Sequence, residues 1–337
     1  MTDLPFISSK QIFAQRPPKN QVQPDRPYGY IIEQECGVDR TLNQVVTLFL
    51  TGSECAFKCV MCDLWKNTLD YSTPIGALPQ QITWALQDLE VNWQKPLARN
   101  ISAIKLYNSG NFFDKRAVPV NDWPEIAKLV SNFQTVIVEN HPAFCNDHVF
   151  QFQELISGQL EVAIGLETTH PLILPWLNKQ MTLRQYEEAV KKLLARNIQI
   201  RTFILVKPPF LNEHEGIEWA IKSMEFAFNC GVECCSLVPV RAGNGIMDEL
   251  EQSSFFKAPD ITSLEIVIEA GLEMKKGRIF MDLWNSQIFK GCEGCKPMRL
   301  QRISAMNKYQ SLQPKVQCGV CNAVSYTHLT LPTILLV

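Results

Sequence analysis

Three cysteines lie close together near the start of the chain, where Cys55, Cys59 and Cys62 have the spacing C-x3-C-x2-C. Three thiolates at such a spacing can ligate three irons of a four-iron (4Fe-4S) cluster, which leaves the fourth iron open for a ligand. A structural zinc knuckle and three unligated core thiols are the alternatives. Zinc sites usually use paired C-x2-C units, and no fourth ligand follows nearby. The spacing therefore favours an iron–sulfur cluster with an open position.

A second group of cysteines lies near the end of the chain. Cys292 and Cys295 form one C-x2-C unit, and Cys318 and Cys321 form another after 22 intervening residues. Two such units predict a structural zinc site of the ribbon or knuckle type, with a second iron–sulfur cluster as the alternative. Residues 290–321 carry six Lys and Arg residues and one Glu. A basic metal-binding module could bind a phosphate backbone, whereas a solvated basic face is the plainer interpretation.

The elements that must position the first cysteine group follow a regular alternation. Apolar segments predict strands, and amphipathic segments between them predict helices. Six strand–helix units in succession indicate a parallel α/β sheet with right-handed crossovers. The predicted strands are 44–51, 101–107, 135–139, 160–166, 198–206 and 232–238, with a further strand in 277–284. A doubly wound open sheet is the alternative, but no glycine-rich phosphate loop follows the first of these strands.

Helix starts are predicted from capping residues. Asp122 with Glu125, Thr182 with Gln185, and Thr262 with Glu265 have the spacing of capping boxes. Residues 1–43, which precede the alternation, contain four prolines between 17 and 27 and predict an extended lead-in with a short strand at 30–32.

The cysteine motif resembles the signature of radical S-adenosylmethionine (SAM) enzymes, in which an apolar or aromatic residue such as Met61 precedes the last cysteine. The resemblance implies that the amino and carboxylate groups of SAM chelate the fourth iron. An electron from the cluster would then cleave SAM to methionine and a 5′-deoxyadenosyl radical, which abstracts hydrogen from a substrate. It also implies a partial (βα)6 TIM-type barrel over residues 44–285. The two C-x2-C units predict that a zinc-ribbon-like module follows over residues 286–323.

This resemblance implies particular contacts to SAM at the carboxyl ends of the strands, where parallel barrels have their active sites. Ser109 and Gly110 correspond to a glycine-rich segment that binds the SAM amino group in the family, although one glycine is present here. Glu167 matches a polar position on the fourth strand, and Glu139 on the third strand is a similar candidate. A plain polar turn and solvated carboxylates are the alternatives.

Three further stretches, 106–114, 165–168 and 277–284, resemble the radical SAM subunit of archaeosine synthase and its bacterial relatives, which are distant kin of the elongator-type enzymes that modify tRNA. The resemblance implies a tRNA nucleobase as substrate, a partner subunit, and an electron donor such as ferredoxin or flavodoxin. Two alternatives stay open. The chain could be a radical SAM enzyme for a small molecule or peptide, or a noncatalytic metal-binding interaction protein.

The composition agrees with a globular protein that uses metals. The 337 residues are 46% hydrophobic and 20% charged, the net charge is −2, and there are 12 cysteines. No signal peptide and no apolar stretch of about 20 residues is present, so we expect a cytoplasmic protein without membrane contact. Residues 324–337 resemble translated adapter sequence from DNA library preparation, and we expect them to take no part in the fold or function.

Overall fold

The computed structural model describes residues 7–93 and 101–319. Its centre is a single eight-stranded sheet in which the strands are ordered as in the sequence. The first pair is antiparallel, and every later pair is parallel. The strands are β1 (Gly29–Cys36), β2 (Leu42–Phe49), β3 (Ile101–Tyr107), β4 (Thr135–Asn140), β5 (Gln159–Glu167), β6 (Gln199–Val206), β7 (Cys234–Pro239) and β8 (Arg278–Met281).

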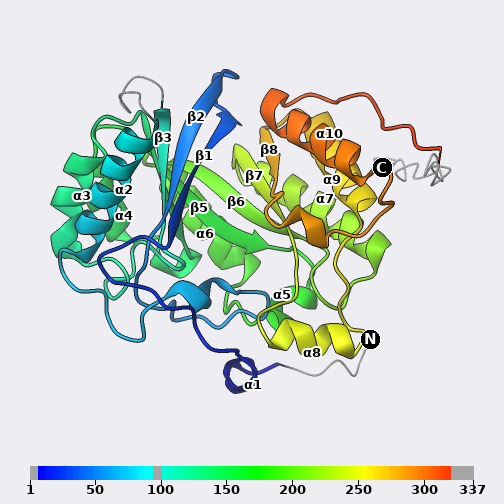
Figure 1. Ribbon diagram of the computed structural model, residues 1–337, viewed down its shortest axis with the longest axis horizontal. Coiled ribbons are helices and arrows are strands. Elements are labelled where there is room, and N and C mark those ends of the chain that lie inside the picture. Colours follow the sequence, from blue (N-terminus) through cyan, green and yellow to red (C-terminus); the bar gives the residue numbers. More distant parts are fainter. Residues whose placement is uncertain (1–6, 94–100, 320–337) are drawn as a thin grey trace.

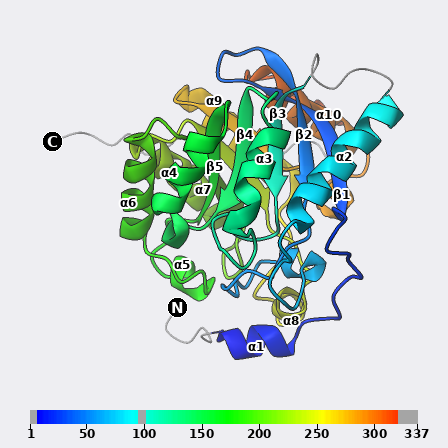
Figure 2. The same ribbon diagram turned by 90° about the vertical axis from the view of Figure 1, so that its left-hand side faces the viewer.

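Helices cover the outer side of this curved sheet (Figures 1 and 2). The helices are α1 (Ser9–Ala14), α2 (Ala77–Trp93), α3 (Trp123–Leu129), α4 (Asp147–Leu155), α5 (Ile173–Trp176), α6 (Leu183–Leu194), α7 (Glu213–Asn229), α8 (Ile246–Gln252), α9 (Ile261–Met274) and α10 (Lys296–Tyr309). The main core lies between the outward-facing side chains of the strands and helices α2, α3, α4, α6, α7, α9 and α10, whereas α1 and α8 pack in a second apolar cluster. Within the described residues, no helix combines the length and the apolar character that crossing a bilayer requires.

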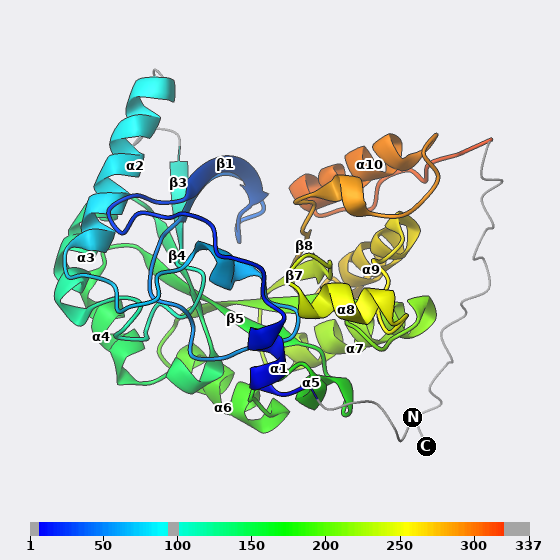
Figure 3. The ribbon, with the colours of Figure 1, turned by 60° about the horizontal axis from the view of Figure 1, so that its bottom comes forward.

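The expected partial barrel is confirmed. The six predicted strands correspond to β2 to β7, and β8 is the additional strand. In the described part of the chain, no pairing joins β1 to β8, so the barrel stays open along that edge. Figure 3 brings the carboxyl ends of the parallel strands forward and shows the sheet curving from β3 round to β8.

The lead-in is more ordered than expected. The short strand predicted at 30–32 is the eight-residue strand β1, which forms a hairpin with β2. Asp39 Oδ1 accepts hydrogen bonds from the backbone N–H and the hydroxyl of Thr41 at 3.0 and 2.7 Å, which stabilises the turn. Helix α1 was not predicted, and it begins with a capping box between Ser8 and Gln11.

Two of the three predicted capping boxes are wrong, because tertiary contacts use the same side chains. The Thr182 box forms at the start of α6. Asp122 is the N-cap residue of α3 as predicted, but its side chain makes no capping bond, since its Oδ1 accepts from the backbone N–H of Gly76 at 2.8 Å. The N-cap of α9 is Asp260, whose Oδ1 accepts from the backbone N–H of Thr262 at 2.9 Å. Glu265 is instead buried between two arginines of α10.

Buried charges fill the barrel at the amino ends of its parallel strands. Arg201 donates to Glu35 at 2.9 Å and to Glu161 at 2.6 Å, and Arg278 donates to Glu161 at 3.2 Å. Lys105 also pairs with Glu35. Although burial raises the pKa of the Glu35 carboxyl, Arg201 and Lys105 together hold it well below its ordinary range. The network joins β1, β3, β5, β6 and β8 at the end of the barrel opposite the cysteine loop.

We expect Arg201→Met to lower the free energy of unfolding by ~3–5 kcal/mol, because Glu35 and Glu161 would lose a shared buried partner. Urea denaturation followed by circular dichroism measures this loss. Arg184→Met is the matched control, since the Arg184 side chain is 86% exposed in its pair with Glu188. Equal stability of the two variants would contradict the role assigned to the network.

Candidate functional site

The residues between β2 and the 3₁₀ helix Leu64–Asn67 form an irregular segment, which we call the cysteine loop (residues 50–63). It carries Cys55, Cys59 and Cys62, which are free thiols. Side-chain amides from distant segments fix its backbone. Asn178 Nδ2 donates to Lys58 O at 2.7 Å, and Asn244 Nδ2 donates to Val60 O at 2.7 Å and to Cys62 O at 3.0 Å. The loop is therefore held by the segments that follow β5 and β7.

The three thiols lie near one another in a poorly solvated place. Burial raises the pKa of the Cys59 thiol to about 12 and raises those of Cys55 and Cys62 as well, and the neighbouring thiols contribute to the shifts of Cys59 and Cys62. Two N–H donors point at Cys55 Sγ, the side-chain amide of Asn111 at 3.2 Å and the backbone of Phe57 at 3.4 Å. Such donors stabilise the thiolate that a metal requires and tune iron–sulfur clusters. This donor set fits an iron–sulfur cluster.

Lys179 brings a positive charge to the same place. Its Nζ lies 2.6 Å from Glu167 Oε1, and both side chains are buried. The Lys179 charge acts on Cys59 and Cys55 and partly offsets the effect of burial on the pKa of both thiols. The sequence analysis missed Lys179 because it lies in an irregular segment 12 residues beyond the end of β5, where spacing carries no signal.

Glu167 is positioned by an unusual backbone at the end of β5. It adopts a left-handed conformation with φ of 66°, and the pairing register with β6 shifts between Gly165 and Glu167. A Cβ atom at Gly165 would lie 2.2 Å from Glu167 Oε1 and 2.5 Å from Lys179 Nζ, so a side chain there would displace this ion pair. The irregular strand end thus turns the Glu167 carboxylate toward Lys179.

Glu139 holds the segment that follows β3. Its Oε1 accepts from the backbone N–H of Gly110 at 3.0 Å, and Ser109 Oγ lies 2.9 Å from the hydroxyl of Tyr28. Burial raises the pKa of Glu139 to about 7, and the backbone N–H groups of residues 108–110 oppose that shift. A Cβ atom at Gly110 would lie 3.5 Å from the Cβ of Cys55, so this segment lies directly beside the cysteine loop. Neither Glu139 nor Glu167 is a solvated strand-end carboxylate, since both are buried.

His141 supports the cysteine loop. Its ring stacks on that of Phe57 with centroids 3.9 Å apart. Nδ1 accepts from the backbone N–H of Ala143 at 3.1 Å, so the proton lies on Nε2, which donates to Lys179 O at 3.0 Å. Burial lowers the pKa of His141 to about 3, and a neutral, fully bonded ring is suited to packing.

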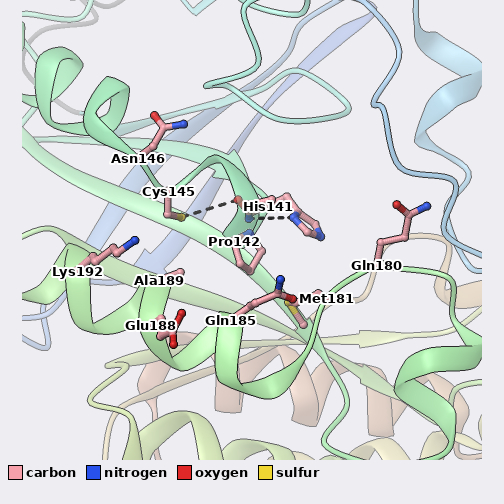
Figure 4. Close-up of a pocket in the computed structure, with 11 residues that line it drawn as sticks. His141, Pro142, Cys145, Asn146, Gln180, Met181, Gln185, Glu188, Ala189 and Lys192 are labelled. Atoms are coloured by element: carbon pink, nitrogen blue, oxygen red, sulfur yellow. Dashed lines mark hydrogen bonds between the residues drawn. The ribbon is translucent and has the colours of Figure 1, made fainter.

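A pocket of about 240 Å³ opens on the other side of His141, between the 3₁₀ helix Pro142–Phe144 and α6 (Figure 4). Its floor is formed by Pro142, Met181 and Ala189, and Lys192 and Glu188 lie at its rim. None of the three cysteines of the loop lines this pocket, so it is separate from the cysteine site.

The second cysteine group also comes together. The sulfurs of Cys292, Cys295 and Cys318 all lie within 4.8 Å of one another, which fits a shared metal ion. Cys321, the fourth predicted ligand, lies outside the described residues. The chain between the two C-x2-C units forms helix α10, which packs on α9, β8 and β1. Arg299 Nε donates to Cys295 Sγ at 3.2 Å, so this thiol group is tied to the barrel.

Two of the basic residues near this group, which we expected to bind phosphate, form ion pairs inside the protein. Arg299 and Arg302 are buried and pair with Glu265 of α9, and Arg302 pairs with Glu269 as well. The prediction of a basic phosphate-binding face is wrong for these two residues, because α10 turns them toward α9.

We expect the purified chain to contain about one zinc ion, which Cys295→Ser should largely remove, because the variant loses one of the described thiolate ligands. Inductively coupled plasma mass spectrometry measures the stoichiometry. Cys230→Ser is the control, since Cys230 lies outside both cysteine groups. Zinc retained by Cys295→Ser, or iron in place of zinc, would contradict this assignment.

Comparison with known proteins supports the resemblance to archaeosine synthase. An uncharacterized protein of Methanocaldococcus jannaschii is 23% identical over 313 residues, which cover 87% of this chain and 85% of that protein. Archaeosine synthase subunit beta of Thermococcus kodakarensis is 23% identical over 254 residues, 70% of this chain and 74% of that protein. No protein-family model matches the chain.

Among solved structures, Elp3 of Methanocaldococcus infernus superposes with a TM-score of 0.49 and 15% identity, covering 68% of this chain and 59% of that one. The predicted resemblance to the beta subunit of archaeosine synthase is confirmed by the sequence comparison.

Proposed function

We propose that this chain is a radical SAM enzyme that binds a 4Fe-4S cluster through Cys55, Cys59 and Cys62 and modifies a nucleobase in tRNA. The observation that carries the proposal is the cysteine loop, where three thiols lie at the carboxyl ends of a parallel barrel with N–H donors directed at Cys55 Sγ. When bound, the cluster supplies the electron that cleaves SAM to methionine and a 5′-deoxyadenosyl radical.

The residues of the chain around the loop suit a zwitterionic amino-acid group. Ser109 and Gly110 lie beside Cys55, and their backbone would receive the amino group of SAM. The buried ammonium of Lys179 would bind its carboxylate, and Glu167 orients that ammonium through their 2.6 Å contact. Glu139 keeps the 108–110 segment in place through its hydrogen bond to Gly110. Glu139 and Glu167 therefore act as positioning residues.

The segment before β1 covers the outer side of the cysteine loop and excludes water from it. Ile12 of α1 is 1% exposed and belongs to the same buried apolar cluster as Val60 and Leu177. Arg16 donates to Glu54 of the loop at 2.8 Å, and its guanidinium lies over the ring of Trp65. Helices α1, α5 and α8 lie together at this end of the barrel in Figures 1 and 2.

We expect anaerobically reconstituted protein to bind about four irons per chain and to cleave SAM after reduction with dithionite. Cys59→Ala should lose most of the iron and at least about 100-fold of the SAM cleavage, because three thiolates are needed to hold the cluster. Iron analysis and chromatographic detection of 5′-deoxyadenosine measure both effects, with Cys230→Ala as the matched control. Wild-type protein that binds no iron or does not cleave SAM would leave a noncatalytic metal-binding protein as the better interpretation, and cleavage unaffected by Cys59→Ala would contradict the role assigned to that cysteine.

The proposal of a tRNA nucleobase as substrate rests on the similarity to the relatives named archaeosine synthase subunit beta. Those named archaeosine synthase subunit beta carry the term subunit in their names, and we infer that this chain also works with a partner subunit. A ferredoxin or flavodoxin is the proposed electron donor, because the reaction needs one low-potential electron at a time. If the next experiment finds tRNA unchanged, a small molecule or a peptide becomes the better candidate for the substrate.

We expect deletion of the gene to change one modified nucleoside in total tRNA. Mass spectrometry of nucleoside digests from the deletion strain should show the loss of that nucleoside and the accumulation of its precursor. Wild-type protein should restore the nucleoside, and Cys59→Ala should not, because the change depends on the cluster. Identical nucleoside profiles with and without the gene would contradict tRNA modification and leave the SAM-cleavage proposal intact.

A further inference from the structure

Aromatic side chains gather at the open edge of the barrel, on the side of the cysteine loop. Phe49 at the end of β2 contacts Trp284, which follows β8, with ring centroids 5.5 Å apart in an edge-on arrangement. Tyr28 stacks on Phe49 at 5.6 Å, and its hydroxyl reaches Ser109. These rings come from segments on both sides of the unpaired edge between β1 and β8. Trp284 is 47% exposed, so much of its indole is open to a ligand.

Asp282 follows directly after β8 and lies beside this cluster. Along β8, Arg278 and Phe280 face the interior, where Arg278 joins the buried charges and Phe280 lies beneath the guanidinium of Arg201. Asp282 continues that alternation. Its Oδ1 accepts from the backbone N–H of Trp284 at 2.8 Å, which fixes the carboxyl next to the indole. Burial raises the pKa of Asp282.

Arg241, which follows the neighbouring strand β7, forms no ion pair with Asp282. Its Nε lies 3.7 Å from Asp63 Oδ2 of the cysteine loop, and its Nη1 donates to Trp284 O at 3.5 Å. Among the ion pairs within residues 7–93 and 101–319, none includes Asp282. The carboxyl group therefore keeps acceptor capacity for a ligand, and Arg241 links the cysteine loop to Trp284.

Aromatic rings also lie in the barrel interior below this place. Tyr107 of β3 and Phe203 of β6 face one another inside the barrel with centroids 6.3 Å apart. Both are only half-buried although they lie on central strands, whereas the outward-facing Leu106 and Ile204 beside them are fully buried. These two rings therefore lie inside the barrel, below the strand ends that carry the cysteine loop.

We propose that Trp284 and Asp282 form a binding site for a planar nitrogen heterocycle, a base turned out of an RNA strand, at the open edge of the barrel. The ring stacks on the exposed indole, as bases do on aromatic side chains. An N–H group on the edge of the base donates to the Asp282 carboxyl group. The unpaired edge between β1 and β8 admits the base while the rest of the strand stays outside. This inference rests on the proposed function and names the residues that select its substrate.

The test is saturation-transfer difference NMR on the reconstituted protein with an equimolar mixture of adenosine, guanosine, cytidine and uridine. We expect saturation of base protons in the wild type. Trp284→Leu should weaken binding about tenfold, because leucine keeps apolar bulk but offers no π face, whereas Trp284→Phe should keep most of it. Asp282→Asn should weaken the preferred nucleoside more than the others. Tyr309→Leu is the control, since Tyr309 is an exposed aromatic residue at the end of α10.

Three results would overturn the site. They are the absence of base-proton signals with the wild type, a signal with Trp284→Leu equal to that of the wild type, and a loss of signal with Tyr309→Leu equal to that with Trp284→Leu. Circular dichroism and the thermal midpoint of each variant show whether it is folded, and the Trp284→Phe and Trp284→Leu pair compares two substitutions of similar bulk. The measurement needs neither reductant nor SAM cleavage. Failure here therefore rejects the base site alone, and failure of iron binding or SAM cleavage rejects the proposed function alone.

Discussion

The cysteine loop depends on hydrogen bonds from other parts of the chain, because apart from one isolated bridge at Ser53 it has no regular structure of its own. Asn178 and Asn244, which follow β5 and β7, bond its carbonyl groups, and Asn111, which follows β3, donates to a sulfur. A barrel of parallel strands makes this possible, since it brings the carboxyl ends of all its strands to one rim. The geometry of the three thiols is therefore a property of the whole barrel.

Charge is distributed differently at the two ends of the barrel. At the amino ends of the parallel strands, arginine and carboxylate side chains satisfy one another in a closed network around Arg201. At the carboxyl ends, the Glu167–Lys179 pair lies next to the thiols, and the positive charges of Lys179 and Lys58 act on Cys59 and Cys55. A buried ion pair is costly to desolvate, so its contribution to stability alone is small. The first network fills the amino end of the barrel, and the second pair is the one that we propose for binding a zwitterionic ligand.

Helix α10 connects the second cysteine group to the same barrel. Arg299 contacts both Cys295 Sγ and Glu265 of α9, so one side chain joins the second cysteine group to the helix layer. Metal bound there would hold α10 against α9 and β8. The chain continues from β8 into Asp282 and Trp284. The position of α10 therefore affects where these two residues lie at the open edge of the barrel. Asn307 and Gln310 of the α10 region accept hydrogen bonds from the backbone N–H groups of Met281 and Ile279, respectively. These bonds connect α10 directly to β8.

The sequence by itself determined the order and type of the main elements and the identity of the two cysteine groups, because hydrophobic periodicity and ligand spacing are local properties. It also placed Glu139 and Glu167 at strand ends. Tertiary structure alone decided what those carboxylates contact, and it added Lys179, Asn111 and Tyr28 to the site. It also reassigned Arg299, Arg302 and Glu265 from a basic surface and a helix cap to one buried cluster. The partner of a charged side chain depends on which distant segment packs against it, and no local pattern records that choice.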